Sequence, residues 1–438
     1  MAGYSKSWKI AVCLALCAFL AILFLAILFG CGESNTGKGA SSGGSTHKCY
    51  LDADADTYGD PFVSTGTDGE GCPAGWVEDN TDCNDSNPEV NPGIVEGPSN
   101  RGSCFDGLDN NCDGVADVAD EDCHPIIFGR CADEPPAGVE LPAPPPDYPY
   151  GECPQIRPGR NTIKAGNPPG SMREFLLLAP EDLDPAEKLP VVFMWHWLAG
   201  SAAEFAEKGD VQTAVNKMRF LAVIPEAKGD LLFTWPFLLF DSQRRINDEL
   251  LFFDHMLACI SRQYNVNLNC VSSVGVSAGG AWTTYLAHER SRHLASFISL
   301  SGGTGHPDDP FNPVQYWSHA EHILPALVLW GGPFDWCGLS FAMTSNHLED
   351  YLTEDGHFFV ECIHNCQHAE PPSDEDAQTK YAFLWNFIFD HPYWLEDGKS
   401  PYLYEGLPDT FPYWCGIGDG SATIREGECE SGLFGDCF

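Results

Sequence analysis

Short apolar runs alternate with amphipathic segments of helix length between residues 160 and 395. Apolar runs bounded by turn residues predict buried strands, whereas apolar residues at three- and four-residue spacing predict helices. Strands are predicted at residues 172–180, 190–197, 220–227, 270–277, 295–302, 325–332 and 357–364, and helices at 247–264 and 281–294. The alternation predicts an α/β fold with a mostly parallel central sheet that helices cover on both faces.

Residues 1–30 have the polar and apolar order of an export signal. Two lysines precede an apolar run that extends to Phe29, which predicts a signal peptide. The run ends in the letters LFGC and resembles a bacterial lipobox, which implies a lipid on Cys31. Residues 31–47 are rich in glycine, serine and threonine and predict a flexible tether. An uncleaved transmembrane anchor is the alternative, because about 20 apolar residues can span a bilayer.

Charge and cysteine content indicate an exported protein. The formal net charge is -40, and such a chain repels polyphosphates, which argues against a nucleic-acid partner. Nineteen cysteines are more than reduced cytosolic proteins usually carry. Without Cys13, Cys17 and Cys31 an even sixteen remain, which is compatible with full pairing. We therefore expect a cell-surface or outer-membrane lipoprotein, attached to the membrane through its N-terminal lipid.

Residues 48–123 predict an acidic, cysteine-rich module. Between Lys48 and Asp147 there are 23 acidic residues against three basic ones. A concentration of carboxylates favours a hard cation, and a solvated acidic spacer is the alternative. The segment has so few apolar residues that disulfides and cations must hold it together.

Two loops of this module have the spacing of calcium ligands. The first loop has threonine at its sixth position, where glycine is usual, and valine at its twelfth. Its carboxylates are Asp52, Asp54, Asp56 and Asp60. The second loop, DNNCDGVADVAD, fits better because Gly114 occupies the sharp turn. Its predicted ligands are Asp109, Asn111, Asp113, Asp117 and Asp120.

The whole stretch from Cys49 to Cys123 resembles the acidic, disulfide-rich metal-binding repeats of bacterial surface proteins. It is more distantly similar to thrombospondin type 3 repeats. The resemblance implies structural calcium held by carboxylates and backbone carbonyls, with little regular secondary structure. Because some of these repeats are associated with copper, copper is the alternative ion.

The segments around the α/β region carry no predicted chemistry. Residues 124–159 are rich in proline and predict a semi-rigid linker that holds the next domain away from the surface. Residues 396–438 form a tail that contains three cysteines, and we expect disulfides to pack it against the α/β domain. Two further disulfides are compatible with the sequence, which does not determine whether they form. One would pair Cys362 with Cys366, and the other would pair Cys259 with Cys270.

The sequence VSSVGVSAGGAW places Ser277 between a predicted strand and a predicted helix. Gly275 and Gly279 remove side chains that would crowd a tight turn, and the turn would expose the serine hydroxyl at the carboxyl edge of the sheet. A serine needs a base to act as a nucleophile. Asp335 and His368 each follow a later predicted strand, and the order Ser, Asp, His is the chain order of α/β-hydrolases.

Several assignments at this site have alternatives. Ser277 could be an ordinary turn residue, and His364 competes with His368 as the base. Asp350 and Asp355 compete with Asp335, although they lie in a segment that predicts a helix and its end. For four tryptophans the sequence favours neither of two positions, the lining of a site or the apolar core. They are Trp195, Trp197, Trp235 and Trp282.

Residues 172–393 resemble the secreted polyhydroxyalkanoate depolymerase and feruloyl esterase group of α/β-hydrolases. Five motifs match in order: HWLAGS, VIPEA, GVSAGG, GGPFD and ECIHNCQHAEPP. The resemblance implies that Ser277 is the nucleophile, Asp335 the orienting acid and His368 the general base. It also implies backbone oxyanion donors at Ala278 and Trp197, with Leu198 as an alternative to Trp197. The sequence has Trp197 where the group usually has glycine.

The expected function is that of a secreted serine carboxylic-ester hydrolase that works through an acyl-enzyme and needs no cofactor for catalysis. By the resemblance, the substrate is a polyester or an ester linked to a cell wall. Two alternatives belong to other classes. One is a serine peptidase of the same fold, and the other is a surface-binding protein whose hydrolase site is disabled.

Overall fold

The protein is described from a computed structural model that covers residues 47–67, 71–94, 103, 107–116, 120, 130–231, 233–373 and 379–429. The predicted signal peptide, the lipobox cysteine Cys31 and nearly all of the predicted tether lie outside these residues. Within the described part of the chain, no helix has both the length and the apolar character needed to cross a bilayer.

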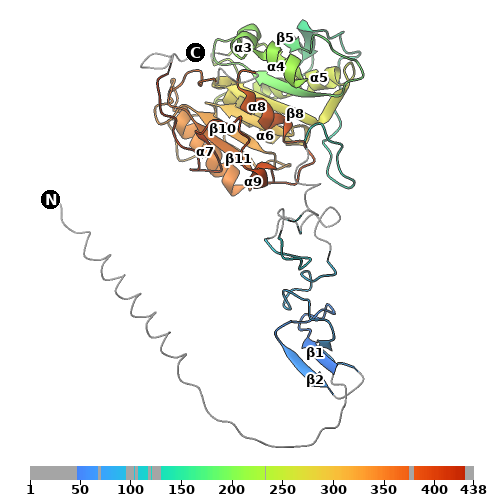
Figure 1. Ribbon diagram of the computed structural model, residues 1–438. Helices are drawn as coiled ribbons and strands as arrows, with labels where there is room; N and C mark the ends of the chain where they lie inside the picture. Colours follow the sequence, from blue (N-terminus) through green and yellow to red (C-terminus); the bar gives the residue numbers. More distant parts are fainter. Residues whose placement is uncertain are drawn as a thin grey trace, which may run out of the picture.

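A nine-stranded sheet forms the centre of the large domain (Figure 1). Its strand order is β12-β11-β10-β9-β8-β6-β7-β5-β4. The strands from β11 to β7 are parallel, whereas β5, β4 and β12 pair antiparallel at the two edges. The strands are β4 (Gly159–Ala165), β5 (Ser171–Leu178), β6 (Leu189–Trp195), β7 (Leu221–Pro225), β8 (Val266–Val276), β9 (Ser296–Leu300), β10 (Ala326–Trp330), β11 (Phe359–Ile363) and β12 (Cys415–Ile417).

Helices cover both faces of this sheet, and each face has its own apolar core. On one face lie α5 (Gln243–Ile260), α6 (Ala278–Glu289) and α7 (Phe341–Glu354). On the other face lie α3 (Ala202–Lys208), α4 (Val211–Met218), α8 (Ala382–Phe389) and the short α9 (Tyr402–Glu405). Alternate side chains of the central strands enter the two cores, since successive residues of a strand point to opposite faces.

All seven predicted strands are present, and the predicted α/β fold is confirmed. Two edge strands escaped prediction. In β4 only alternate positions are buried, and β12 has three residues that form a strand only by pairing with β11. Both depend on a neighbouring strand, which a local pattern does not reveal.

The stretch from Arg130 to the start of β4 is not the predicted spacer. Cys131 is bonded to Cys270 and Cys153 to Cys259, so this stretch is fastened to the α/β domain. Arg130 adds an ion pair with Asp390 at 2.7 Å. The proline-rich composition was interpreted as a linker, but disulfides to β8 and α5 make this stretch part of the domain.

The disulfides also correct the two pairings considered from the sequence. Cys362 bonds Cys415 and Cys366 bonds Cys429, rather than each other. Cys259 and Cys270 likewise bond other partners. The predicted attachment of the C-terminal tail by disulfides is confirmed for both described bonds.

The acidic module contains a small three-stranded antiparallel sheet in the order β2-β1-β3. Its strands are β1 (His47–Leu51), β2 (Ser64–Thr67) and β3 (Trp76–Val77). A Cys49–Cys72 disulfide closes this sheet, and a Cys83–Cys112 disulfide connects the region after it to the second acidic loop. Covalent bonds thus substitute for the apolar core that the module lacks.

Two carboxyl groups are buried together where α7 packs against β11. Glu349 and Glu361 are each at most 3% exposed, and Trp330 Nε1 donates a hydrogen bond to Glu349 at 3.2 Å. Burial, and secondarily the nearby Glu361, raises the pKa of Glu349 to about 9. Glu349 is therefore uncharged in the folded protein at neutral pH.

This burial predicts a pH-dependent gain in stability for Glu349→Gln. Below the unfolded pKa, near 4.5, Glu349 is protonated in both states, so the substitution changes little. As the pH rises toward 9, only the unfolded state ionises, and the wild type loses stability while the Gln variant does not. We expect a Tm increase of about 3–6 °C at pH 8 and little change at pH 4.5. Asp350→Asn, at an exposed position of α7, is the control for calorimetry at both pH values. An equal shift at both would contradict the prediction.

Candidate functional site

Ser277 lies on a sharp turn between β8 and α6. Its backbone has φ 57° and ψ −119°, a conformation that L-residues rarely adopt and that marks strain at a functional position. A Cβ on Gly275 would lie 2.0 Å from the carbonyl oxygen of Gly279, and a Cβ on Gly279 would lie 2.0 Å from that of Trp195. Only glycine fits at these two positions, which is the physical reason for the G-x-S-x-G spacing.

The structure brings Ser277, His368 and Asp335 together in one hydrogen-bonded chain. Asp335 follows β10 and His368 follows β11, so both lie at the carboxyl edge of the sheet with the serine. His368 Nδ1 lies 2.6 Å from Asp335 Oδ1, and His368 Nε2 lies 2.8 Å from Ser277 Oγ. An ionised carboxylate only accepts, so Nδ1 donates to Asp335 and Nε2 can accept the serine proton. All three side chains are buried.

Two further groups orient Asp335. The Ser301 hydroxyl donates to Asp335 Oδ2 at 2.7 Å, and the Gly331 backbone N–H donates to the same oxygen at 2.8 Å. Sequence reasoning missed Ser301. Its position near the end of the predicted strand at 295–302 was a usable signal, because neighbouring parallel strands end at the same edge.

The loop that carries His368 is held on three sides. A Cys366–Cys429 disulfide ties it to the tail, and the Phe341 ring stacks on the imidazole with 4.2 Å between centroids. Gln367 has φ 59°. Gly331 packs closely against it, since a Cβ on Gly331 would lie 1.8 Å from the carbonyl oxygen of Gln367. The disulfide of Cys366 thus holds the His368 loop against the tail rather than against Cys362.

The competing residues lie in other environments. His364 Nδ1 accepts a hydrogen bond from the Cys366 backbone N–H, and burial lowers the pKa of His364 to about 4. Asp355 caps the end of α7 and accepts a hydrogen bond from Trp317 Nε1 at 2.8 Å. Asp350 is exposed on α7. Neither aspartate is the one that bonds His368.

The two predicted oxyanion donors lie beside the nucleophile. Ala278 is the first residue of α6, where backbone N–H groups lack helical partners. Trp197 follows β6, whose end touches the start of α6 at Gly279. Their role as oxyanion donors stays a prediction. Three of the four tryptophans considered for the site are fully buried in the core, namely Trp195, Trp235 and Trp282.

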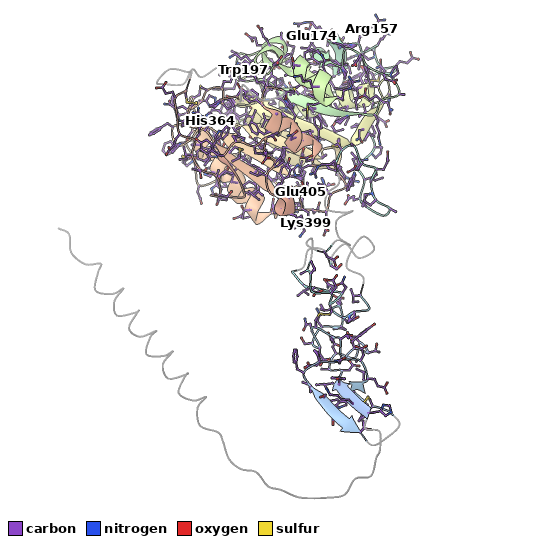
Figure 2. All side chains as sticks on the ribbon, in the orientation of Figure 1. Arg157, Glu174, Trp197, His364, Lys399 and Glu405 are labelled. Carbon is purple, nitrogen blue, oxygen red and sulfur yellow. A yellow bond between two sulfur atoms is a disulfide. The ribbon has the colours of Figure 1, made fainter. Side chains whose placement is uncertain are left out.

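An apolar cavity opens next to Ser277 on the α3–α4–α8 face of the sheet. The volume open to the centres of water-sized molecules is about 120 Å³. Ser277, His368, Trp197 and His364 all line it, and in Figure 2 Trp197 and His364 lie on one side of the large domain, away from Glu405. The cavity therefore gives Ser277 an adjoining space whose lining is mainly apolar.

The first acidic loop gathers carboxylates, but the set differs from the predicted one. Asp54 groups with Asp52 and Asp85 on one side and with Asp56 and Asp82 on the other, with ligand atoms within 4.8 Å in each group. Asp82 and Asp85 come from the next segment of the chain. Predicted ligand Asp60 is in neither group, and its Oδ1 accepts a hydrogen bond from the Phe62 backbone N–H.

The oxygens of this group fit a cation. Asp56 and Asp82 each accept a backbone N–H with Oδ1, while Oδ2 of each is buried and makes no hydrogen bond among the described residues. Both carboxylate oxygens of Asp54 are buried in the same way. Burial, followed by neighbouring carboxylates, raises the pKa of Asp54 and Asp82. Oxygen-only donors suit Ca²⁺ better than copper, which favours nitrogen and sulfur ligands as well.

The second acidic loop uses its side chains differently. Asp109 accepts the backbone N–H groups of Asp113 and Gly114, and Asn111 Nδ2 donates to Asp120. Predicted ligand Asp117 lies outside the described residues. Among the residues that are described, this loop contributes to no metal-sized group of carboxylates. The sequence pattern favoured this loop, but its described carboxylates accept hydrogen bonds from within the loop, from backbone N–H groups and from the Asn111 side chain.

Comparisons with known proteins give one sequence match and distant structural likenesses. Residues 82–118 match the family model Cu-binding_MopE, described as a "Putative metal-binding motif". This range includes Asp82 and Asp85 and the second acidic loop. No curated protein sequence matches the chain.

Solved structures resemble the large domain at low identity. Native sOPH is 17% identical, with 64% of this chain and all of that chain covered and a TM-score of 0.49. A ferulic acid esterase is 17% identical, with 47% and 88% covered and a TM-score of 0.37. An esterase of Pyrobaculum calidifontis is 17% identical, with 48% and 76% covered and a TM-score of 0.33. The assignment of the α/β-hydrolase fold rests on the strand order and on the strand–serine–helix turn, not on these likenesses.

Proposed function

We propose that the large domain is a serine carboxylic-ester hydrolase. The observation that carries the proposal is the hydrogen-bonded chain from Ser277 through His368 to Asp335 at the carboxyl edge of the sheet. A strained serine between a strand and a helix N-terminus, next to a base that a buried carboxylate orients, is the arrangement that acyl transfer requires.

The proposed reaction has two acyl-transfer steps. Ser277 Oγ attacks the ester carbonyl carbon while its proton passes to His368 Nε2, and Asp335 stabilises the imidazolium through Nδ1–H. The backbone N–H groups of Ala278 and Trp197 stabilise the oxyanion. The carbon–oxygen bond to the alcohol breaks, and His368 returns the proton to the leaving alkoxide. Water then attacks the acyl-enzyme with His368 as the base, which releases the acid and the free serine.

A panel of aryl esters and matching anilides tests this proposal. An ester hydrolase cleaves p-nitrophenyl acetate well and the corresponding anilide poorly, whereas a peptidase of the same fold cleaves peptide anilides. A surface-binding protein with a disabled site cleaves neither and does not react with a fluorophosphonate. We expect ester cleavage and stoichiometric fluorophosphonate labelling. No cleavage together with no labelling would refute the proposal.

We also propose that the acidic module holds structural Ca²⁺. The residues that would hold it are Asp52, Asp54, Asp56, Asp82 and Asp85. The buried, unbonded oxygens of Asp54 and Asp82 support this assignment, because unpaired buried carboxylates are costly without a cation. A bound cation would neutralise the repulsion within the group and connect two segments of a module that has little apolar core.

We further propose that the protein is exported and anchored at the cell surface through a lipid on Cys31. The order of charges and apolar residues, the lipobox-like LFGC and the many disulfides support this location. Cys31→Ala is expected to release the protein from the membrane fraction into the soluble one, because a lipid attached to Cys31 would be lost. Fractionation of cells that express either form measures this, and unchanged tight retention would favour a transmembrane anchor instead.

A further inference from the structure

The floor and one wall of the cavity beside Ser277 are formed by apolar side chains. Its floor is formed by Val274, Leu300 and Leu329 on three adjacent strands, and α8 contributes Leu384 and Trp385. All of these are at most 8% exposed. A space of this kind stabilises apolar groups by removing them from water, and it disfavours groups that need hydrogen bonds.

The polar groups that line the cavity are engaged or uncharged. Ser301 donates to Asp335, the Trp385 indole donates to the Lys380 carbonyl, and the Tyr381 hydroxyl donates to Glu370. His364 is neutral at pH 7 because burial lowers its pKa. The charged residues Lys208 and Glu370 are exposed. His364 Nε2 is a buried atom of a lining residue with no hydrogen-bond partner among the described residues, so the lining offers a neutral N–H group. A charged group deep in the cavity would meet no buried side chain of opposite charge.

Trp197 completes the wall next to the nucleophile. Its ring stacks near Phe205 with 6.0 Å between centroids, and Lys208 Nζ lies 4.8 Å from the ring centroid. Gly200 packs so closely that an added Cβ would lie 2.9 Å from the indole. The tryptophan that replaces the expected glycine is thus fixed in place and adds an apolar surface within reach of the bond that reacts.

From these walls we propose that the cavity binds the acyl chain of the substrate and selects an uncharged, apolar chain of medium length. The inference rests on the proposed ester hydrolysis. After the first step the alcohol must leave while the acyl group stays bonded to Ser277, so an adjoining apolar cavity suits the group that remains. The cavity volume of about 120 Å³ has room for roughly eight water-sized groups. Leu384 and Trp197 are specificity-determining residues.

The test compares kcat/KM for p-nitrophenyl esters of increasing acyl length. We expect a gain of about fourfold for each methylene that enters the cavity, and therefore roughly 250-fold for the four methylenes that separate hexanoate from acetate. A hexanoate analogue with a terminal carboxylate should lose most of this gain. Alkyl acetates with longer alcohols should show little gain. A flat acyl profile, or a gain that follows the alcohol chain, would overturn the inference.

Leu384→Trp tests the cavity itself, because the larger ring would fill it. The ratio of kcat/KM for hexanoate to that for acetate should fall at least about tenfold, and the acetate rate of the same variant corrects for partial misfolding. Leu403→Trp makes the same change at an exposed position of α9 and should retain the wild-type profile. An unchanged ratio in Leu384→Trp refutes the acyl cavity but leaves ester hydrolysis standing. Failure of the wild type on every ester refutes the proposed function instead.

Discussion

Ser277→Ala is expected to abolish fluorophosphonate labelling and to reduce kcat for p-nitrophenyl acetate by a factor of about 10⁴ or more. The serine oxygen is the atom that His368 Nε2 contacts at 2.8 Å, and without it the acyl-enzyme cannot form. Alanine removes only the hydroxyl from a position with φ 57°, so the strained turn and the fold should persist. Stopped assays with intact-mass spectrometry of the labelled protein measure both effects.

Ser261→Ala is the matched control, because Ser261 lies at the end of α5 and its hydroxyl contacts only the Ala258 carbonyl among its described hydrogen bonds. This variant should label and turn over like the wild type. If Ser277→Ala retained activity, the hydrogen-bonded chain would have no catalytic role. If both serine variants lost labelling while unfolding at lower temperature, the loss would reflect instability rather than chemistry.

Asp82→Asn is expected to weaken calcium binding at least about tenfold, which corresponds to about 1.4 kcal/mol. The substitution removes one negative charge from the group. Asp82 is only 2% exposed, and its Oδ2 makes no hydrogen bond among the described residues. Calcium at 100 times its Kd should stabilise the wild-type module by about 2.7 kcal/mol, and the variant should gain less at the same concentration. Titration calorimetry and thermal unfolding with and without chelator measure these effects on the full chain.

Asp60→Asn is the control. It distinguishes the ligands that the structure brings together from those that the sequence pattern predicts. The sequence pattern includes Asp60, but the structure places its carboxylate outside both groups of candidate ligands. The structure therefore predicts that Asp60→Asn leaves the calcium affinity nearly unchanged, although it removes the same charge as Asp82→Asn. Equal losses for the two variants would mean that only the overall negative charge attracts the ion. No heat at millimolar calcium in the wild type would contradict the calcium site.

Local patterns were sufficient for the strands and for the nucleophile. Apolar runs identified every central strand, because strands buried on both faces are mostly apolar along their length. The G-x-S-x-G spacing identified Gly275 and Gly279 as glycines that the turn requires. The structure confirms this, because the turn around Ser277 leaves no space for a Cβ at either position. The chain order then limited the candidate acid and base partners of Ser277 to residues in the loops after later strands, such as Asp335 and His368. Loops that follow parallel strands meet at one edge of the sheet.

The sequence by itself determined the α/β fold, Ser277 as the candidate nucleophile and the order in which its acid and base follow it along the chain. Only the tertiary structure decided between His368 and His364, brought Ser301 to Asp335 and fastened residues 130–159 to the large domain. It also replaced Asp60 by Asp82 and Asp85 in the acidic group. The physical reason is the same in each case: hydrogen bonds, disulfides and ligand groups join atoms that are distant in the chain, and periodicity and spacing carry information only about neighbours.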